Sequence, residues 1–352
     1  MIFESRWQLI RCFFLVFTVY ALSLAGASAL AAGIHYHVIH REVLGGAGGW
    51  DYLKVDSQAR RVYISRGDHV LVLNTGAYRQ VGEIPNTQGV HCIDIAPRLE
   101  RGFVSDGEAS AVTIFNRRTL KTIKEVKTTG RGPDALVYDP ATERVFTFNG
   151  QSDDSTALDA KTGKVLGTID LGGRPEFAVS DGRGMIYNNL EDKSEELAIN
   201  AGTLKIMSRW PLAPCEHPSG LAIDRQNRRL FVGCHNGMMA ILNANTGKVI
   251  TTVPIGPGVD ANRYDPGTHL AFSTNGGNGT LTVVREITPN RFSLVENAST
   301  ERGARTMGLD LETHRIFTVT AKFGPMPPRK PGQRFRRPNI VPGTFTLLVL
   351  AP

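Results

Sequence analysis

One short pattern recurs seven times along this chain and restricts its fold more than any other feature. Each copy has an apolar run ending near Asp, a few turn residues, and a second run that follows Arg, as in LVYDPATERVFTF and LAIDRQNRRLFVG. The Asp position of successive copies falls at intervals of 40, 43, 41, 44, 41 and 45 residues, at Asp56, Ala96, Asp139, Ser180, Asp224, Asp265 and Asp310. A repeat of this length, built from short β-type runs, is typical of propeller blades, which must stack in a ring to bury their faces.

The sequence therefore predicts an all-β, seven-bladed β-propeller with four antiparallel strands in each blade. In unit five, SGLAID, RRLFVGC, MMAILNA and KVITTVPI are four β-type runs, and NANTGK supplies hairpin-forming Asn and Gly. Unit seven has only three such runs, whereas residues 35–44 form an isolated one. We expect residues 35–44 to pair into the last blade, because this closes the ring and removes an exposed sheet edge. Residues 32–352 then form a single propeller domain.

Residues 1–31 are predicted to be a signal peptide. Arg6 and Arg11 precede an uncharged apolar run that ends in small residues suited to signal peptidase, ASA at 27–29 or ALA at 29–31. The alternative is an uncleaved membrane anchor. Cleavage would release a periplasmic or secreted protein without a stable transmembrane anchor, which we expect to be a monomer.

Three cysteines follow the predicted signal peptide. Cys215 lies just before the first strand of unit five and Cys234 ends its second strand. These positions are adjacent in an antiparallel pair, so we expect a disulfide in an oxidising compartment, while Cys92 stays free and buried. The alternative is a metal site, because His217 and His235 flank the pair.

The positive charge of the chain is concentrated in one segment. The formal net charge is +7, of which the predicted signal peptide carries +1. The remaining six positive charges equal the six Lys and Arg residues of the Pro-rich insertion at 322–343, which contains no acid. This insertion could bind an anionic polymer such as nucleic acid, an envelope polymer or anionic lipid, through Arg329, Lys330, Arg334, Arg336 and Arg337. The alternative is a solvated cover over one end of the ring.

The second candidate site is one mouth of the central channel. The innermost strands of a propeller begin at one face, and five positions before the repeat anchors stand Asp51, His91, Asp134, Pro175, Ser219, Asp260 and Arg305, with Glu176 next to Pro175. The ends of the second strands carry further polar residues, among them Asn149, Asn188, His235 and Asn275. Such a ring could bind a hydrated cation or a cationic or polyhydroxy ligand. The alternative is that Asp and Asn satisfy backbone donors at strand ends.

The units GPDALVYDPATERVFTFN and LDAKTGKVLGTIDLG, with their counterparts in unit five, resemble the YVTN-repeat, YncE-like seven-bladed propellers. The resemblance covers residues 35–350 and implies an exported protein. Catalytic signatures such as G-x-S-x-G, H-E-x-x-H or a P-loop are absent. We therefore expect a non-enzymatic binding or scaffold protein without a cofactor, whose partner could also be an envelope protein. Two alternatives follow from the resemblance: a lactonase- or lyase-like hydrolase with a divalent cation at the channel mouth, and a single-stranded nucleic-acid binder.

Overall fold

The computed structural model describes residues 34–328 and 338–352. The chain divides into two units, Met1–His35 and Tyr36–Pro352, and the described strands all belong to the second. The predicted signal peptide at 1–31 and the basic residues at 329–337 lie outside the described residues. No helix within the described ranges has the length and hydropathy that a membrane span requires.

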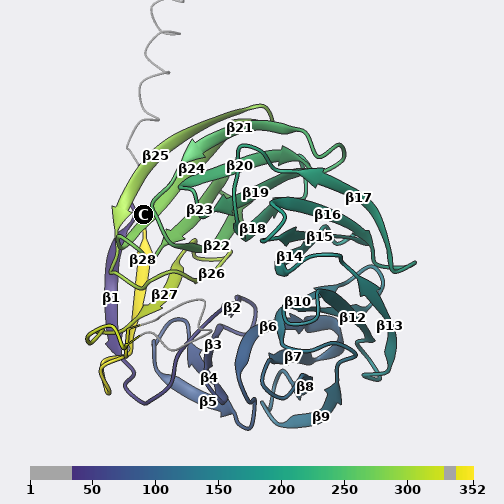
Figure 1. Cartoon of the computed structure of the whole chain (residues 1–352). Helices are drawn as coiled ribbons and strands as arrows, with labels where there is room; N and C mark the ends of the chain where they lie inside the picture. The colour runs from purple at the N-terminus through teal and green to yellow at the C-terminus, as the bar shows by residue number, and fades with distance from the viewer. Residues whose placement is uncertain (1–33, 329–337) are drawn as a thin grey trace, which may run out of the picture. The chain divides into compact units, whose positions relative to one another are not determined.

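The second unit is a ring of seven four-stranded antiparallel sheets (Figure 1), as the repeat predicts. Each sheet runs from an inner strand near the axis to an outer strand at the rim. The first three blades contain β2 (Leu53–Asp56), β3 (Arg61–Arg66), β4 (His69–Asn74) and β5 (Gln80–Ile84); β6 (Val90–Ala96), β7 (Arg101–Asp106), β8 (Ala111–Asn116) and β9 (Thr122–Lys127); and β10 (Pro133–Asp139), β11 (Arg144–Asn149), β12 (Asp154–Asp159) and β13 (Val165–Asp170). One short 3-10 helix, η1 (Pro97–Leu99), joins β6 to β7.

The remaining blades follow the same order. They contain β14 (Pro175–Ser180), β15 (Met185–Leu190), β16 (Glu195–Asn200) and β17 (Lys205–Pro211); β18 (Pro218–Asp224), β19 (Arg229–Cys234), β20 (Met238–Asn243) and β21 (Val249–Pro254); β22 (Val259–Asp265), β23 (Leu270–Asn275), β24 (Thr280–Thr288) and β25 (Arg291–Ser299); and, in the last blade, β26 (Met307–Leu309), β27 (Ile316–Thr320), β28 (Thr346–Ala351) and β1 (His37–Val43).

The last blade closes the ring with the first strand of the chain. Strand β1 pairs antiparallel with β28, from His37 opposite Ala351 to Val43 opposite Thr346. Tyr36, which precedes β1, is buried and donates a hydrogen bond from its hydroxyl to the His314 carbonyl at 3.0 Å. The prediction that residues 35–44 complete this blade is confirmed.

The second strands of the blades are the most buried, and the outer strands are the least buried. Second strands such as β19 and β23 are buried at every position, because both of their faces pack against neighbouring blades. The outer strands β1 and β17 alternate exposed and half-buried residues, because one face meets solvent. The apolar core therefore lies between the blades and leaves the starts of the inner strands available for polar side chains.

The repeated Asp holds the turn that follows an inner strand in the blades that carry it. Asp224 and Asp265 each accept a hydrogen bond from the backbone N–H two residues later, at 2.9 Å. In unit four Asp181 does this, accepting from Arg183 N–H at 2.7 Å, and its own N–H donates to the carbonyl of Met185, the first residue of β15. The repeat anchor of unit four is thus Asp181 and not Ser180. The Ser180 hydroxyl accepts from the N–H of Gly182 in the same way, which explains the similarity of the two positions.

Cys215 and Cys234 are joined by a disulfide, with a Cα–Cα distance of 5.6 Å. Cys234 ends β19 and lies opposite Pro218 at the start of β18, so the antiparallel register brings the two cysteines together. The predicted disulfide is confirmed, and the alternative of cysteine metal ligands is not. Crosslinking residues 19 apart stabilises the fold by about 3 kcal/mol in the chain-entropy model. Cys92 is free and buried, as predicted.

The two ends of the basic insertion pack onto the propeller. Phe323 forms an isolated antiparallel bridge with Ile340, and the N–H of Gly324 donates to the carbonyl of Asn339 at 2.7 Å. The ring of Phe323 lies 6.0 Å from that of Trp50, the residue that precedes Asp51. The described base of the insertion therefore lies beside the predicted channel mouth.

Candidate binding site at the channel mouth

Each blade places one side chain at the same position near the start of its inner strand. In five blades the pairing between the first two strands shifts register directly after the first residue, as between Pro133 and Leu136 or between Pro175 and Ala178. The residue after that first pair leaves the regular ladder. Including the equivalent residues of blades one and seven, the set is Asp51, His91, Asp134, Glu176, Ser219, Asp260 and Arg305, which we call the acidic ring.

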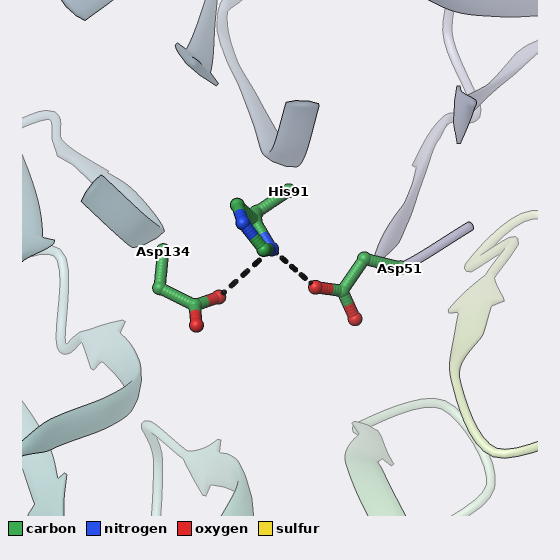
Figure 2. A group of neighbouring side chains, drawn as sticks. All are labelled: Asp51, His91 and Asp134. Carbon is green, nitrogen blue, oxygen red and sulfur yellow. Dashed lines mark hydrogen bonds and ion pairs between the residues drawn. The ribbon is translucent and has the colours of Figure 1, made fainter. Parts of the chain in front are cut away.

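The first three members of the acidic ring converge on one atom (Figure 2). The Nδ1 atom of His91 lies 2.6 Å from Oδ2 of Asp51 and 3.6 Å from Oδ1 of Asp134. One ligand atom from each of the three residues lies within 4.8 Å of the others. A single ring nitrogen carries at most one proton and can donate it to one carboxylate at a time. The carboxylates of Asp51 and Asp134 therefore compete for a single hydrogen bond from Nδ1 of His91.

Arg305 neutralises part of the negative charge of the acidic ring. Its Nε lies 2.6 Å from Oδ2 of Asp260, and its Nη2 lies 3.4 Å from Oδ1 of Asp51. Nη2 also donates to the carbonyl of Trp50 at 2.7 Å. Burial lowers the pKa of Arg305, but the charges of Asp260 and Asp51 outweigh it, so the net shift is upward. Arg305 is therefore a fixed cation that holds two carboxylates in place.

Glu176 contacts two hydroxyl groups within the acidic ring. Its Oε1 accepts from the Tyr52 hydroxyl at 3.3 Å and from the Ser219 hydroxyl at 3.4 Å. The Ser219 hydroxyl also lies 3.1 Å from Oδ1 of Asp260. Burial, and then the charges of Asp134 and Asp260, raise the pKa of Glu176 well above its usual value. Burial and the Glu176 charge likewise raise the pKa of Tyr52. The raised pKa values favour the protonated forms of both the Glu176 carboxyl and the Tyr52 hydroxyl.

The polar residues predicted at the ends of the second strands do not join the acidic ring. Asn149 is buried, and its Nδ2 donates to Thr156 Oγ1 at 3.0 Å within its own blade. The Asn275 amide is also buried and contacts the hydroxyls of Thr280 and Thr282. His235 is exposed at the turn after the Cys215–Cys234 disulfide. Asn149 and Asn275 therefore stabilise strand ends, which is the alternative that the sequence left open.

Asn188 has an indirect connection to the acidic ring. Its Nδ2 donates to the carbonyl of Phe177 at 3.1 Å and lies 3.4 Å from that of Glu176. Asn188 therefore supports the backbone from which Glu176 projects. Sequence reasoning missed Tyr52, whose role depends on a contact with Glu176, 124 positions away in the sequence. The only local signal was an aromatic residue next to Asp51.

The seven four-stranded blades define a β-propeller protein with a polar ring at the starts of its inner strands. No protein-family model matches the chain, and no curated protein matches it. Among solved structures, it is similar to the structure of U3-55K, with a TM-score of 0.71 and 9% identity over 90% of this chain and 98% of that one.

Two further structures have the same fold. The crystal structure of RRP9 WD40 repeats has a TM-score of 0.71 and 8% identity, over 90% of this chain and 99% of that one. Kuenenia stuttgartiensis hydrazine synthase has a TM-score of 0.67 and 13% identity, over 77% of this chain and 92% of that one. At these identities the likeness concerns the fold alone.

Proposed function

We propose that this chain is an exported, non-enzymatic binding protein of the YVTN-repeat, YncE-like kind, whose ligand site is the acidic ring. The observation that carries the proposal is the convergence of ionisable side chains from six different blades at one equivalent position. A strand end needs at most one Asp or Asn to satisfy its own backbone. Contacts between side chains of different blades do not serve that purpose.

The charge of the ring selects a cation as ligand. The ring contains four carboxyl groups, one guanidinium and one imidazole, which is a formal charge of −2 when His91 is neutral and Glu176 is protonated. The side chains of Asp134 and His91 are 30% and 38% exposed, so a ligand from solvent can reach them. Carboxylates held close together in a partly enclosed site raise the local concentration of cations. An organic amine could pair with Asp134 and Asp51, with the Glu176 side as the neutral end of the site.

A second candidate is a divalent-cation site formed by Asp51, His91 and Asp134. The specific observation in its favour is the grouping of one nitrogen and two carboxylate ligand atoms within 4.8 Å. This mixed donor set suits Mn²⁺, Zn²⁺ or Fe²⁺ better than Ca²⁺, which prefers oxygen ligands alone. Such a site is what the alternative of a lactonase- or lyase-like hydrolase would require.

Calorimetric titration of purified residues 32–352 with spermidine and, separately, with Mn²⁺ and Zn²⁺ tests both candidates. We expect saturable spermidine binding that is lost in Asp134→Asn. The matched control is Asp153→Asn, because Asp153 is exposed and has a positive φ of 57° that Asn also adopts readily. Stoichiometric metal binding that depends on Asp134 would favour the second candidate. Absence of binding to all three probes would contradict both.

A further inference from the structure

A cavity separate from the acidic ring lies on the propeller axis, between the later residues of the inner strands. Its volume is about 390 Å³, and six of the seven inner strands contribute to its wall. The lining includes the apolar residues Ile93, Leu136, Phe177 and Leu221, together with the charged residues Lys54, Asp94, Asp224, Arg225 and Arg263. No member of the acidic ring lines this cavity.

Tyr52 separates the cavity from the acidic ring. Its ring centroid lies 4.8 Å from that of Phe177, which lines the cavity, and its hydroxyl donates to Glu176 in the acidic ring. Tyr52 is itself buried. The axis therefore carries two chemically different sites, with an aromatic contact between them.

The cavity wall contains Arg263, whose guanidinium has no ion-pair partner among the described residues, although the charge of Asp94 in the same wall acts on it. Nη1 of Arg263 donates to the carbonyl of Asn262 at 2.7 Å, and Nη2 lies 3.5 Å from the carbonyl of Leu53. The guanidinium carbon lies 5.0 Å from the centroid of the Phe177 ring. Among the ion pairs between described residues, none involves Arg263, whereas Lys54 in the same wall pairs with Asp94 at 2.6 Å.

An unpaired cation in such surroundings is a site for an anion. Burial lowers the pKa of Arg263, which reflects the cost of keeping its charge away from water. The two carbonyls are weak partners for a full charge, and further donors of the planar guanidinium stay available. A carboxylate beside the guanidinium would form a charge-assisted, bidentate pair and reduce that cost.

We propose that this axial cavity binds a small organic monoanion, a carboxylate with an apolar body. The carboxylate pairs with Arg263, and the body packs against Ile93, Leu136 and Leu221. The cavity volume lies at the small end of the usual range for ligand pockets, about 300–1,000 Å³, which suits a molecule of roughly ten non-hydrogen atoms.

The test compares benzoate with benzamide, which has nearly the same shape and no charge. Titration of residues 32–352 should give saturable binding of benzoate that is at least about tenfold tighter than that of benzamide, because a charge-assisted pair replaces a neutral one. Arg263→Gln should abolish this preference. Arg118→Gln is the matched control, because it removes the same charge from an exposed residue.

Equal affinities for the two probes, or no benzoate binding at millimolar concentration, would overturn the proposal. An unchanged benzoate affinity in Arg263→Gln would do the same. If that variant does not fold, the comparison of benzoate with benzamide on the unmodified protein still decides. Asp134→Asn should leave benzoate binding unchanged, so the outcome does not depend on the acidic ring.

Discussion

Replacing Glu176 with glutamine should change how the stability of the propeller depends on pH. The Glu176 carboxyl is enclosed by Tyr52 and Ser219, and its pKa is raised well above the ordinary 4.5, first by burial and then by the charges of Asp134 and Asp260. Above pH 4.5 the unfolded chain loses the Glu176 proton, whereas the folded protein keeps it up to the raised pKa. The folded state binds more protons in this window, so its stability falls as the pH rises.

The size of this pH dependence follows from a difference of one bound proton between the folded and unfolded states. A difference of one bound proton changes the free energy of unfolding by about 1.4 kcal/mol per pH unit. The contribution of Glu176 to the stability of the folded protein is fully present below pH 4.5. It is lost as the pH rises toward the raised pKa of Glu176. Glutamine does not titrate, and its carbonyl still accepts from the Tyr52 hydroxyl. The variant should therefore match the original protein near pH 4.5 and exceed its stability by about 1.4 kcal/mol for each further pH unit within the window.

Urea unfolding between about pH 4 and about pH 8 measures this difference directly. The control is Glu83→Gln, because it removes the same kind of carboxyl group from an exposed position on the outer strand β5. A constant difference between Glu176→Gln and the original protein across the whole range would refute the reasoning. It would mean that Glu176 titrates alike in the folded and unfolded states.

Two further predictions concern the edge of the ring and the basic insertion. Deleting residues 35–44 removes β1 and exposes the edge of β28, so we expect the variant to aggregate, which light scattering measures. A monomeric variant with unchanged thermal stability would contradict the role of β1 in closing the ring. Replacing the five basic residues at 329–337 with glutamine should abolish binding to single-stranded DNA, heparin or anionic lipid without loss of stability, and binding by the original protein should weaken steeply with salt. If the original protein has no affinity for these polyanions at low salt, the insertion is not a polyanion site. The residues to change are Arg329, Lys330, Arg334, Arg336 and Arg337.

The repeat was sufficient to predict the fold because each blade contains the information for its own strands. The anchors, the hairpin residues and the missing fourth strand of unit seven are all local features, and the ring follows once blades must cover each other. The small error at unit four has a local origin too. Ser180 and Asp181 are adjacent, and both accept a turn hydrogen bond, so spacing alone did not separate them.

The candidate sites were only partly visible in the sequence, for a different reason. The acidic ring could be found because its members recur at one position of the repeat. The same counting also placed Asn149 and Asn275 near the mouth, although their amides bond within their own blades. Arg263 could not be found, because its significance lies in the absence of an ion-pair partner within the described chain. Such a property depends on how six blades meet and not on any one of them.

The pairing of β1 with β28 also governs the order in which the molecule can be completed. The strands of six other blades lie between β1 and β28 in the sequence, and His37 lies opposite Ala351. A chain still being synthesised has β1 but lacks its partner β28 until the six blades between them have been made. Six blades could assemble from neighbouring strands, while the seventh must wait for the two distant segments to meet. The final step of folding is therefore delayed. Until it occurs, the last blade has an unpaired strand edge, to which a chaperone or a neighbouring chain could bind.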